Sequence, residues 1–578
     1  MNAFLSEFSP YRESHDLIPL DLSSDLATSI DEALSAITTG SLEPDTDVND
    51  DPTWADAMRS PEREYWIASA RDELKSLEDL KVFILVPHSD VPCSQHHLTG
   101  KLVCKCKHDN TGRITHYKVC YVARGYTQQY GIDYDKTTAP TARLESFCTI
   151  LHIATSLNWD LQQINIKMAF LHGVLPQEET MFMEQPHGFK ADGKETWVMK
   201  LMKSIYGMKQ ASQIWNQTFH QAVLSWGFER LPCEWCVYKR RSPTGTIISA
   251  VHVDDIVTAA SSAEENAQFK AELRSKWEIS DLGAAKFALG IAISCDLKAR
   301  TITLSQTTLI NCVVDEFGQR DAHSVSTPMV GGLQLRCPAK STLMPEHTAW
   351  ARQTPYWSLV GSLMYLAVGT CPDISYTIGC LSSFLDCYTP EHWEAGIRVI
   401  RYLKGTHTLG LSLGGHNPIN LIGYSDSDYA NCPDTSHSIG GYCFTIGSGM
   451  VSWGSRKQHV IADSSCYAEY IALHEVSHEA TFLCQLLSGL DLLPPGPTTL
   501  FCDNDAASKL TEDHMWHSHV KHIRVKYHYI CEQVANGDLT IQWVCLSDNT
   551  SDILTKPLHQ GDFQHLCVFL GLSDTTQD

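Results

Sequence analysis

The sequence predicts an α+β protein of several domains, and three observations carry that prediction. Its 578 residues exceed one ordinary domain, because units of about 150 residues would give three or four of them. Helical and strand patterns alternate between about residues 141 and 300. Beyond Gly414 a second group of strand patterns surrounds a long amphipathic helix.

Composition and charge narrow the class of protein. The apolar runs fall short of the roughly 20 residues of a membrane span, and the N-terminus shows no secretory signal. We therefore expect an intracellular protein, cytoplasmic or nuclear, with no membrane contact. The 21 cysteines are scattered through apolar runs, as is typical of free thiols in a reducing compartment. A formal net charge of -23 argues against a generally nucleic-acid-binding surface, which is normally basic.

The N-terminal part divides into an acidic leader and a basic sheet. Residues 1–53 are rich in Asp, Ser, Thr and Pro without apolar periodicity, which predicts a disordered leader. A helical pattern begins at Trp54, and strand patterns follow at 81–87, 101–107 and 114–126. These strands carry several basic residues that can contact phosphates, although a solvated sheet face is the simpler interpretation.

The segment TIISAVHVDDIVTAA is the most informative in the chain. Its apolar residues stop at Val253, two carboxylates follow and the apolar pattern resumes, which predicts a β-hairpin with Asp254 and Asp255 at its turn. An ordinary polar turn fits the same letters. Two-metal phosphoryl transfer needs carboxylates that converge on hard Mg2+ ions, so a third carboxylate must come from a neighbouring strand. The strand pattern LQQINIKMAFLHG offers Asn165 instead.

The C-terminal half changes character twice. A Pro/Gly/Cys-rich stretch near 326–350 predicts a boundary, and helical patterns follow from about 356 to 405. Two strand patterns then precede an amphipathic helix that Ser464 or Ser465 can cap, and TTLFCDNDAAS is a strand entering a helix. The histidine-rich HMWHSHVKHIRVKYH lacks zinc-site spacing, so we assign it to packing and hydrogen bonding.

An ordered series of motifs runs from Trp54 to Leu558. The motifs are YVARGYTQQYGIDY, AFLHG, MFMEQPHGF, LMKSIYGMKQ, VHVDDI, VGSLMYL, CPDI, IRYLKGT, GYSDSDYA, VSWGSRKQ, SSCYAEY, KHI and SDILTKPL. The series resembles the reverse transcriptase and ribonuclease H portion of the polyprotein of copia-type LTR retrotransposons. The resemblance implies a right-hand polymerase of fingers, palm and thumb (54–325), a connecting region (326–415), an α/β ribonuclease H-like domain (416–560) and a C-terminal tail (561–578).

The resemblance also implies two sets of metal-binding carboxylates. The polymerase set falls at Asp254, Asp255 and position 165, where the family has Asp and this chain has Asn165. A neutral amide removes a formal charge beside the metal ions, so we expect polymerase activity to fall on the order of 10³-fold or more. The ribonuclease H set is complete, although each member alone has the pattern of a surface acid: Asp426, Glu469, Asp503 and Asp552.

Four further positions match the family by role. Lys105 and Arg124 are candidate triphosphate contacts. Gln210 resembles the glutamine near the incoming nucleotide, and Phe170 resembles the aromatic residue under its sugar, although spacing alone favours a core phenylalanine there. The chain departs from the family at Cys120, where Arg is usual, and this change bears on nucleotide binding more than on folding.

The expected function is that of an RNA-directed DNA polymerase with a ribonuclease H domain and an impaired polymerase step. The resemblance implies Mg2+ or Mn2+ as cofactor, and RNA template, RNA/DNA hybrid, primer and dNTPs as partners. The alternative is a catalytically inactive or domesticated remnant that binds nucleic acid or protein on the old scaffold. Asn165 and Cys120 favour the remnant, whereas Asp254, Asp255 and the four nuclease carboxylates favour the enzyme.

Overall fold

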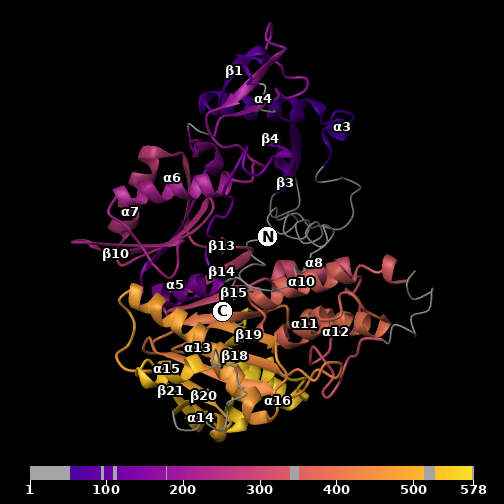
Figure 1. The fold of residues 1–578 in the computed structure, drawn as a ribbon, viewed down its shortest axis with the longest axis vertical. Coiled ribbons are helices and arrows are strands. Elements are labelled where there is room, and N and C mark those ends of the chain that lie inside the picture. Colours follow the sequence, from indigo (N-terminus) through magenta and orange to yellow (C-terminus); the bar gives the residue numbers. More distant parts are fainter. Residues whose placement is uncertain are drawn as a thin grey trace.

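The computed structural model describes residues 52–92, 97–108, 114–176, 179–338, 350–512 and 528–575. Within these residues helices alternate with five β-sheets, which confirms the predicted α+β class (Figure 1). The predicted leader, apart from residues 52 and 53, lies outside the described residues, as does the histidine-rich segment before residue 528. No helix in the described part of the chain is both long enough and apolar enough to cross a membrane.

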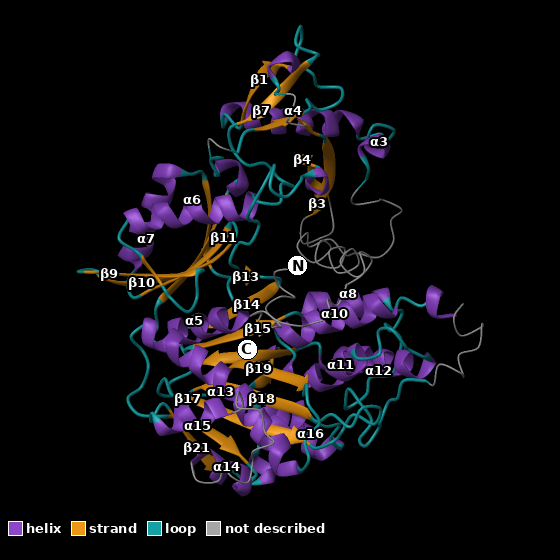
Figure 2. Cartoon of the chain, viewed as in Figure 1, coloured by secondary structure: helices purple, strands orange, loops and turns teal. Residues whose placement is uncertain are grey.

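The N-terminal part is a long hairpin with a helix packed on one face (Figure 2). Trp66 and Ala70 of the helix contact the buried side chains of Cys104, Cys106 and Val119. Because side chains alternate along a strand, the lysines of the hairpin lie on its opposite face. A four-stranded sheet in the order β1-β7-β6-β2 completes this part. The elements are α3 (Trp54–Ala57), α4 (Arg63–Asp79), β1 (Phe83–Pro87), β2 (His97–Leu98), β3 (Gly100–His108), β4 (Ile114–Ala123), β6 (Met181–Met183) and β7 (Trp197–Leu201).

A six-stranded sheet in the order β12-β5-β11-β10-β9-β8 forms the second part. Alternation along β10 sends Ile248 and Ala250 toward α5, and Ile247 and Val251 toward α6 and α7, so helices cover both faces. The predicted hairpin and the strand containing Asn165 are neighbours in the middle of this sheet. The elements are α5 (Leu144–Ser156), β5 (Asp160–Ile166), α6 (Ala211–Ser225), β8 (Glu229–Arg230), β9 (Val237–Ser242), β10 (Gly245–His252), β11 (Asp255–Ala260), α7 (Ala263–Lys276) and β12 (Ile279–Ala284).

A third sheet joins segments that are distant in the sequence. Its order is β13-β14-β15-β16-β22. The strand β16 of the expected connection pairs with β15 of the expected polymerase segment on one side and with β22 of the expected tail on the other. Four helices of the expected connection and its preceding segment lie beside this sheet (Figure 1). The elements are β13 (Phe287–Ala288), β14 (Ile291–Asp296), β15 (Thr301–Ser305), α8 (Thr307–Glu316), α10 (Tyr356–Gly369), α11 (Ser375–Ser382), α12 (Pro390–Thr406), β16 (Leu409–Gly414), α16 (Gln560–Phe569) and β22 (Leu572–Asp574).

The C-terminal domain is a mixed sheet in the order β19-β18-β17-β20-β21. The strand β17 pairs antiparallel with β18 and parallel with β20, and α13 packs on β17 and β18. Ser464 caps α13, because its hydroxyl accepts the backbone N–H of Tyr467. The elements are β17 (Leu421–Asp428), β18 (Ile439–Ile446), β19 (Gly449–Lys457), α13 (Ser465–Gly489), β20 (Thr498–Cys502), α14 (Asp505–Glu512), α15 (Tyr529–Ala535) and β21 (Leu539–Trp543).

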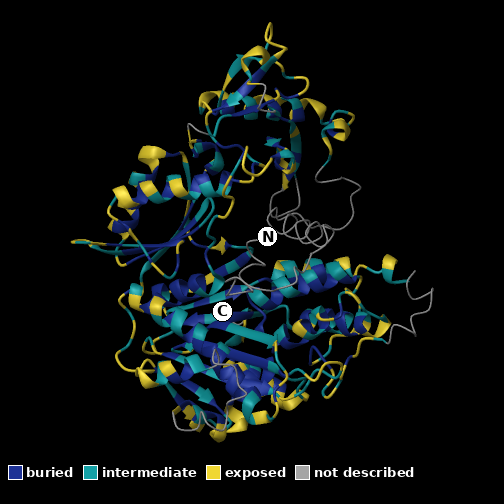
Figure 3. Cartoon of the chain, viewed as in Figure 1, coloured by how far each residue is buried: buried dark blue, intermediate teal, exposed yellow. Residues whose placement is uncertain are grey.

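One apolar core connects the six-stranded sheet with the C-terminal domain. Nearly every residue of α5 is buried, and the same cluster continues through the third sheet into α13 (Figure 3). Cys337 and Cys387 form a disulfide, which corrects the expectation of free thiols at these two positions. No other disulfide joins two cysteines within the described residues.

Candidate functional site

The hairpin of β10 and β11 carries two carboxylates in the middle of the six-stranded sheet. Val253 and Asp254 form its two-residue turn, so Asp255 opens β11 instead of lying in the turn itself. Val253 has a left-handed φ of 58°, which is unusual for a β-branched residue. The indole N–H of Trp215 donates to the carbonyl oxygen of Val253 at 2.7 Å, so α6 holds the turn in place.

The strand β5 places Asn165 directly opposite Asp255. Its amide Nδ2 donates to Oδ2 of Asp254 at 3.1 Å, while Nε2 of Gln163 lies 2.9 Å from each carboxylate oxygen of Asp255. Burial raises the pKa of Asp255 to about 6; the nearby Asp254 adds to the rise and the bond from Gln163 opposes it. Both carboxylates of the hairpin therefore accept hydrogen bonds from amides, and the third position carries no charge.

Asn165 and the two carboxylates line a cleft of about 2010 Å³. The hairpin of β3 and β4 contributes Lys107 and Lys118 to the wall of the cleft. The segment 137–142 and the turn after β13 contribute further residues. Burial and the neighbouring Lys118 lower the pKa of Lys107. The half-exposed rings of Trp235 and Phe287 also line the cleft. Cations and flat apolar rings beside carboxylates suit the phosphates and bases of a nucleic acid.

The four residues expected to contact a nucleotide are all described, and none of them lines this cleft. Gln210 is buried, and its amide is occupied: Nε2 of Gln128 donates to its oxygen at 3.0 Å, and its own nitrogen donates to the Asp133 carbonyl at 2.8 Å. Phe170 packs between two apolar clusters with its ring centroid 5.7 Å from that of Tyr206. Phe170 is therefore partly buried against the core, and its role under a nucleotide sugar stays a prediction.

Lys105 lies on β3 of the N-terminal hairpin, and Arg124 directly follows β4. Lys105 pairs with Lys118 across the two strands, and Arg124 is an exposed residue whose backbone N–H bonds to Thr99. The cleft wall is formed by Lys107 and Lys118 instead. The two-residue alternation of β3 indicates which lysines share a face, but not which of them reaches the cleft.

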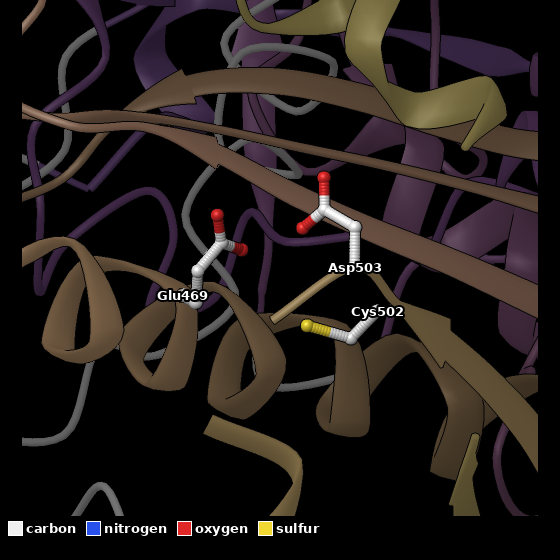
Figure 4. Close-up of side chains that lie close together, drawn as sticks. All are labelled: Glu469, Cys502 and Asp503. Atoms are coloured by element: carbon white, nitrogen blue, oxygen red, sulfur yellow. The ribbon is translucent and has the colours of Figure 1, made fainter. Parts of the chain in front are cut away.

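Four carboxylates converge at one end of the C-terminal sheet. Asp426 comes from β17, Glu469 from α13, Asp503 from the residue after β20, and Asp552 from the 3-10 helix η9 (Thr550–Leu554). Oxygens of Asp426, Asp503 and Asp552 lie within 4.8 Å of one another. Glu469 lies beside Asp503 and a sulfur, that of Cys502 (Figure 4). The structure thus brings together all four residues predicted from the sequence.

A glycine on β18 lets η9 approach the sheet. Gly441 lies opposite Asp426, and a Cβ at this position would lie 2.7 Å from Cγ2 of Thr555 and 2.8 Å from Cβ of Leu554. The missing side chain allows η9 to pack against the strand, which carries Asp552 to the other carboxylates. The side chain of Asn549 donates to the carbonyl of Ser425 at 3.0 Å and fixes the start of η9.

Mutual repulsion and burial dominate the electrostatics of this centre. Burial, together with the charges of Asp426 and Asp503, raises the pKa of Glu469 to about 10. Burial and Asp426 raise the pKa of Asp552 to about 7, against the opposing effect of Lys556. Nζ of Lys556 lies 3.0 Å from Oδ2 of Asp552 and 3.8 Å from Oδ2 of Asp426. Sequence reasoning missed this lysine, although its spacing of four residues from Asp552 was a usable signal.

Two acids close to these carboxylates in the sequence, Asp428 and Asp505, differ in position. Asp428 ends β17, and burial raises its pKa to about 6, with Asp426 adding to the rise. Asp505 is exposed at the start of α14 and pairs with Lys509, away from the cluster. Asp428 therefore remains near the centre, and Asp505 does not belong to it.

The donor set fits a hard divalent cation. Oε2 of Glu469 and Oδ1 of Asp552 are buried and accept no hydrogen bond from the described residues. Buried carboxylate oxygens are normally satisfied, and oxygen-only donors are those that Mg2+ and Mn2+ prefer. A cation among these oxygens would offset the repulsion that raises their pKa values.

Similarity to known proteins identifies the class of this chain as that of reverse transcriptases. The family described as "Reverse transcriptase (RNA-dependent DNA polymerase)" matches residues 81–331. Within that class, the chain belongs to the copia-type retrotransposon polyproteins, as the relatives below show.

Three relatives illustrate the extent of the similarity. The Retrovirus-related Pol polyprotein from transposon TNT 1-94 of Nicotiana tabacum is 37% identical over 513 residues, 89% of this chain and 38% of the relative. The Pol polyprotein from transposon RE1 of Arabidopsis thaliana is 31% identical over 518 residues, 89% of this chain and 34% of the relative. A putative transposon Ty5-1 protein of Saccharomyces cerevisiae is 32% identical over 317 residues, 55% of this chain and 100% of the relative. The chain thus spans little more than a third of the two Pol polyproteins.

Solved structures show a weaker likeness. The foamy viral protease-reverse transcriptase in complex with RNA/DNA hybrid has a TM-score of 0.44 at 9% identity, over 94% of this chain and 65% of that one. The same protein in complex with dsDNA has a TM-score of 0.44 at 10% identity, over 93% of this chain and 99% of that one.

Proposed function

We propose that this chain is the reverse transcriptase and ribonuclease H portion of a retrotransposon polyprotein, with a competent nuclease centre and an impaired polymerase step. The polymerase corresponds to residues 54–325 and the nuclease to 416–560. The observation that carries the proposal is the convergence of the four C-terminal carboxylates. Holding like charges together below the surface costs free energy, and a site for divalent cations is the usual reason for such an arrangement.

Asn165 is the reason to propose an impaired polymerase. Its amide hydrogen occupies an oxygen of Asp254 that a metal ion would need, and its own oxygen brings no charge. The loss of one principal electrostatic group lowers a reaction rate by about 10³-fold. Asp254 and Asp255 remain in place on the hairpin, so two of the three expected positions keep a carboxylate.

The proposed substrates are RNA/DNA hybrid at the nuclease centre, and RNA template, primer and dNTPs at the cleft. Two Mg2+ or Mn2+ ions, held by Asp426, Glu469, Asp503 and Asp552, would activate the attacking oxygen and stabilise the leaving one. Lys556 adds a positive charge next to Asp552, which attracts a polyanionic strand to this side of the centre. In the cleft, Lys107 and Lys118 give an acidic protein the locally basic wall that phosphates require.

The bond between Asn165 and Asp254 also favours a second candidate, a non-catalytic scaffold that binds nucleic acid or protein. A satisfied amide–carboxylate pair stabilises the hairpin without any metal ion. Under this alternative both centres are structural, and neither cleavage nor extension occurs.

A paired assay separates the two candidates. Purified full chain and its Asn165→Asp variant are given primed RNA template and, separately, RNA/DNA hybrid, with Mg2+ and with Mn2+. We expect both proteins to cleave the hybrid and only the variant to extend the primer efficiently. Asn417→Asp, an exposed position outside both centres, controls for an added charge. Failure of both folded proteins to cleave hybrid with either metal would overturn the nuclease proposal and support the scaffold.

A further inference from the structure

Cys502 brings a sulfur into the nuclease centre. Its Sγ, a carboxylate oxygen of Glu469 and a carboxylate oxygen of Asp503 all lie within 4.8 Å of one another. Cys502 ends β20 and is fully buried, whereas Asp503 is half-buried and leaves the group open to solvent. Figure 4 shows the carboxylates of Glu469 and Asp503 turned toward one another between α13 and the end of β20, with the sulfur nearby.

An oxygen without a partner points to a ligand at this position. Glu469 is only 6% exposed, and its Oε2 accepts no hydrogen bond within the described part of the chain. Leaving such an oxygen unsatisfied below the surface is costly unless a cation binds it. Glu469 lies on the side of the centre where the sulfur is.

The charge of Lys556 distinguishes the two sides of the centre. Its Nζ forms ion pairs with Asp552 and Asp426, at 3.0 and 3.8 Å. No ion pair joins Lys556 to Glu469 or Asp503 among the residues that the structure describes. Lys556 therefore acts on Glu469 and Asp503 only through space, and their side has no cation in direct contact among the described residues.

The donors on this side differ in chemistry from a magnesium site. Mg2+ takes oxygen ligands and discriminates against sulfur, whereas Zn2+ binds thiolate and carboxylate together in four-coordinate sites. Among divalent first-row metal ions, such mixed donors also bind Zn2+ more tightly than Mn2+. With Zn–S bonds of about 2.3 Å and Zn–O bonds of about 2.0 Å, adjacent donors lie about 3.5 Å apart, so a small rotation of Glu469 closes the site.

We propose that Glu469, Cys502 and Asp503 form a zinc site inside the nuclease centre, with water as the fourth ligand, and that zinc there blocks metal-dependent cleavage. Binding forms one Zn–S bond and two Zn–O bonds, and it releases to solvent the thiol proton of Cys502 and the carboxyl proton that Glu469 holds in the metal-free protein, with no change of oxidation state. Zinc withdraws Glu469 and Asp503 from the set that would hold Mg2+. The blocking part rests on the nuclease function proposed above, whereas the binding part does not.

Cobalt(II) is the probe for the binding part, because a thiolate ligand gives Co2+ a charge-transfer absorption band in the near ultraviolet. We expect the full chain to show this band, Zn2+ to displace it, and Cys502→Ser to remove it with at least about a 100-fold loss of affinity, more than an outer-sphere change causes. Cys443→Ser is the matched control, since Cys443 is an equally buried thiol on β18 of the same domain.

A second variant keeps the test independent of how well Cys502→Ser folds. Glu469→Gln retains the sulfur and the shape of the side chain but removes a charged ligand, so the band should require at least about 10-fold more Co2+. A band that persists in Cys502→Ser, or an affinity unchanged by Glu469→Gln, would overturn the site.

The blocking part is tested on hybrid cleavage in the presence of Mg2+. We expect Zn2+ to inhibit cleavage by the full chain. The rate of Cys502→Ser is compared with its own zinc-free rate, and we expect its half-inhibition to need at least about 10-fold more Zn2+. Equal inhibition of both proteins would overturn this part. If no zinc-free cleavage occurs, the proposed function fails, while the cobalt band still decides whether the zinc site exists.

Discussion

Asn165 donates a hydrogen bond of 3.1 Å to Asp254, joining the strand β5 to the turn of the neighbouring hairpin. An aspartate at position 165 would repel both carboxylates of the hairpin, whereas the amide is attracted to one of them. The substitution therefore stabilises the metal-free sheet and weakens the metal site at the same time. Structure and catalysis favour different residues at this position.

Asn165→Asp should have opposite effects on activity and stability. Primer extension should rise by about 10³-fold, because the missing charge returns to the metal site. In chelator, the variant should unfold at a lower temperature than the native chain, and Mg2+ should raise its midpoint more than that of the native chain. Single-turnover extension and thermal unfolding with and without Mg2+ measure the two effects. Metal-dependent stabilisation without extension would place the defect elsewhere in the cleft.

Asp552→Asn should abolish hybrid cleavage without unfolding the protein. The substitution removes a charged oxygen from the nuclease centre and leaves Asp426 paired with Lys556, so we expect a loss of about 10³-fold. Asp505→Asn is the control, because Asp505 is exposed and pairs with Lys509 outside the cluster. Initial rates of cleavage at saturating Mg2+ measure the effect. Comparable losses in both variants would remove Asp552 from the proposed centre.

The proposed nuclease centre was predicted from the resemblance to the copia-type family, because each of its acids alone has the pattern of a surface residue. Asp426 lies on β17, Asp503 follows β20 and Asp552 lies on η9, and the fold brings these three positions together. The hairpin was predicted from its apolar pattern, although its turn is shifted by one residue, so that Asp255 opens β11. Local patterns determine such elements because turns and strand alternation depend on neighbouring residues.

Side-chain directions set by distant packing were not predictable in the same way. Gln210 turns inward because Gln128, far away in the sequence, bonds to its amide. Lys107 lines the cleft and Lys105 does not, although both lie on the face of the hairpin opposite α4. The packing of α4 on the hairpin, which sets its orientation, involves residues distant in the sequence. Cys502 was overlooked because it neighbours Asp503 in sequence, and only the approach of α13 brings Glu469 to both of them.

The stability of the protein should depend on pH through Asp373. This carboxyl is buried, accepts a hydrogen bond from Tyr402, and burial raises its pKa to about 6. The thiols of Cys371 and Cys567 face the same pair and are neutral in this range, because burial raises their pKa values too. The folded state thus binds the proton more tightly than the unfolded chain, in which the pKa is about 3.9.

The sign of the effect follows from that difference. The contribution of Asp373 is fully present below about pH 4 and is lost as pH rises through about 6, with a total near 3 kcal/mol for a shift of about two pH units. Asp373→Asn should flatten this part of the profile and stabilise the protein at pH 7. Urea unfolding of both proteins from pH 4.5 to 7.5 measures the difference. A difference that does not change with pH would show that Asp373 does not hold its proton in the folded state.

The six-stranded sheet and the C-terminal domain should unfold as one unit, and Arg143 is where this can be tested. Its Nη2 lies 2.9 Å from Oε2 of Glu479 on α13, and its guanidinium lies 3.9 Å from the ring centroid of Phe482. Arg143 precedes α5, so this contact joins the two halves at the edge of their shared core. Arg143→Met keeps much of the packing but leaves the largely buried Glu479 without its cation, at a cost of about 2 to 3 kcal/mol.

Arg274→Met is the matched change at an exposed ion pair with Asp281 and should cost less than about 1 kcal/mol. If the shared core makes folding cooperative, Arg143→Met should lower the urea midpoint of both halves together. Tryptophan fluorescence, to which the buried Trp215 and Trp277 beside the six-stranded sheet contribute, and hybrid cleavage, which reports the proposed nuclease centre, should then change at one urea concentration. Loss of cleavage well before the change in fluorescence would mean that the two halves unfold separately, in spite of the core between them.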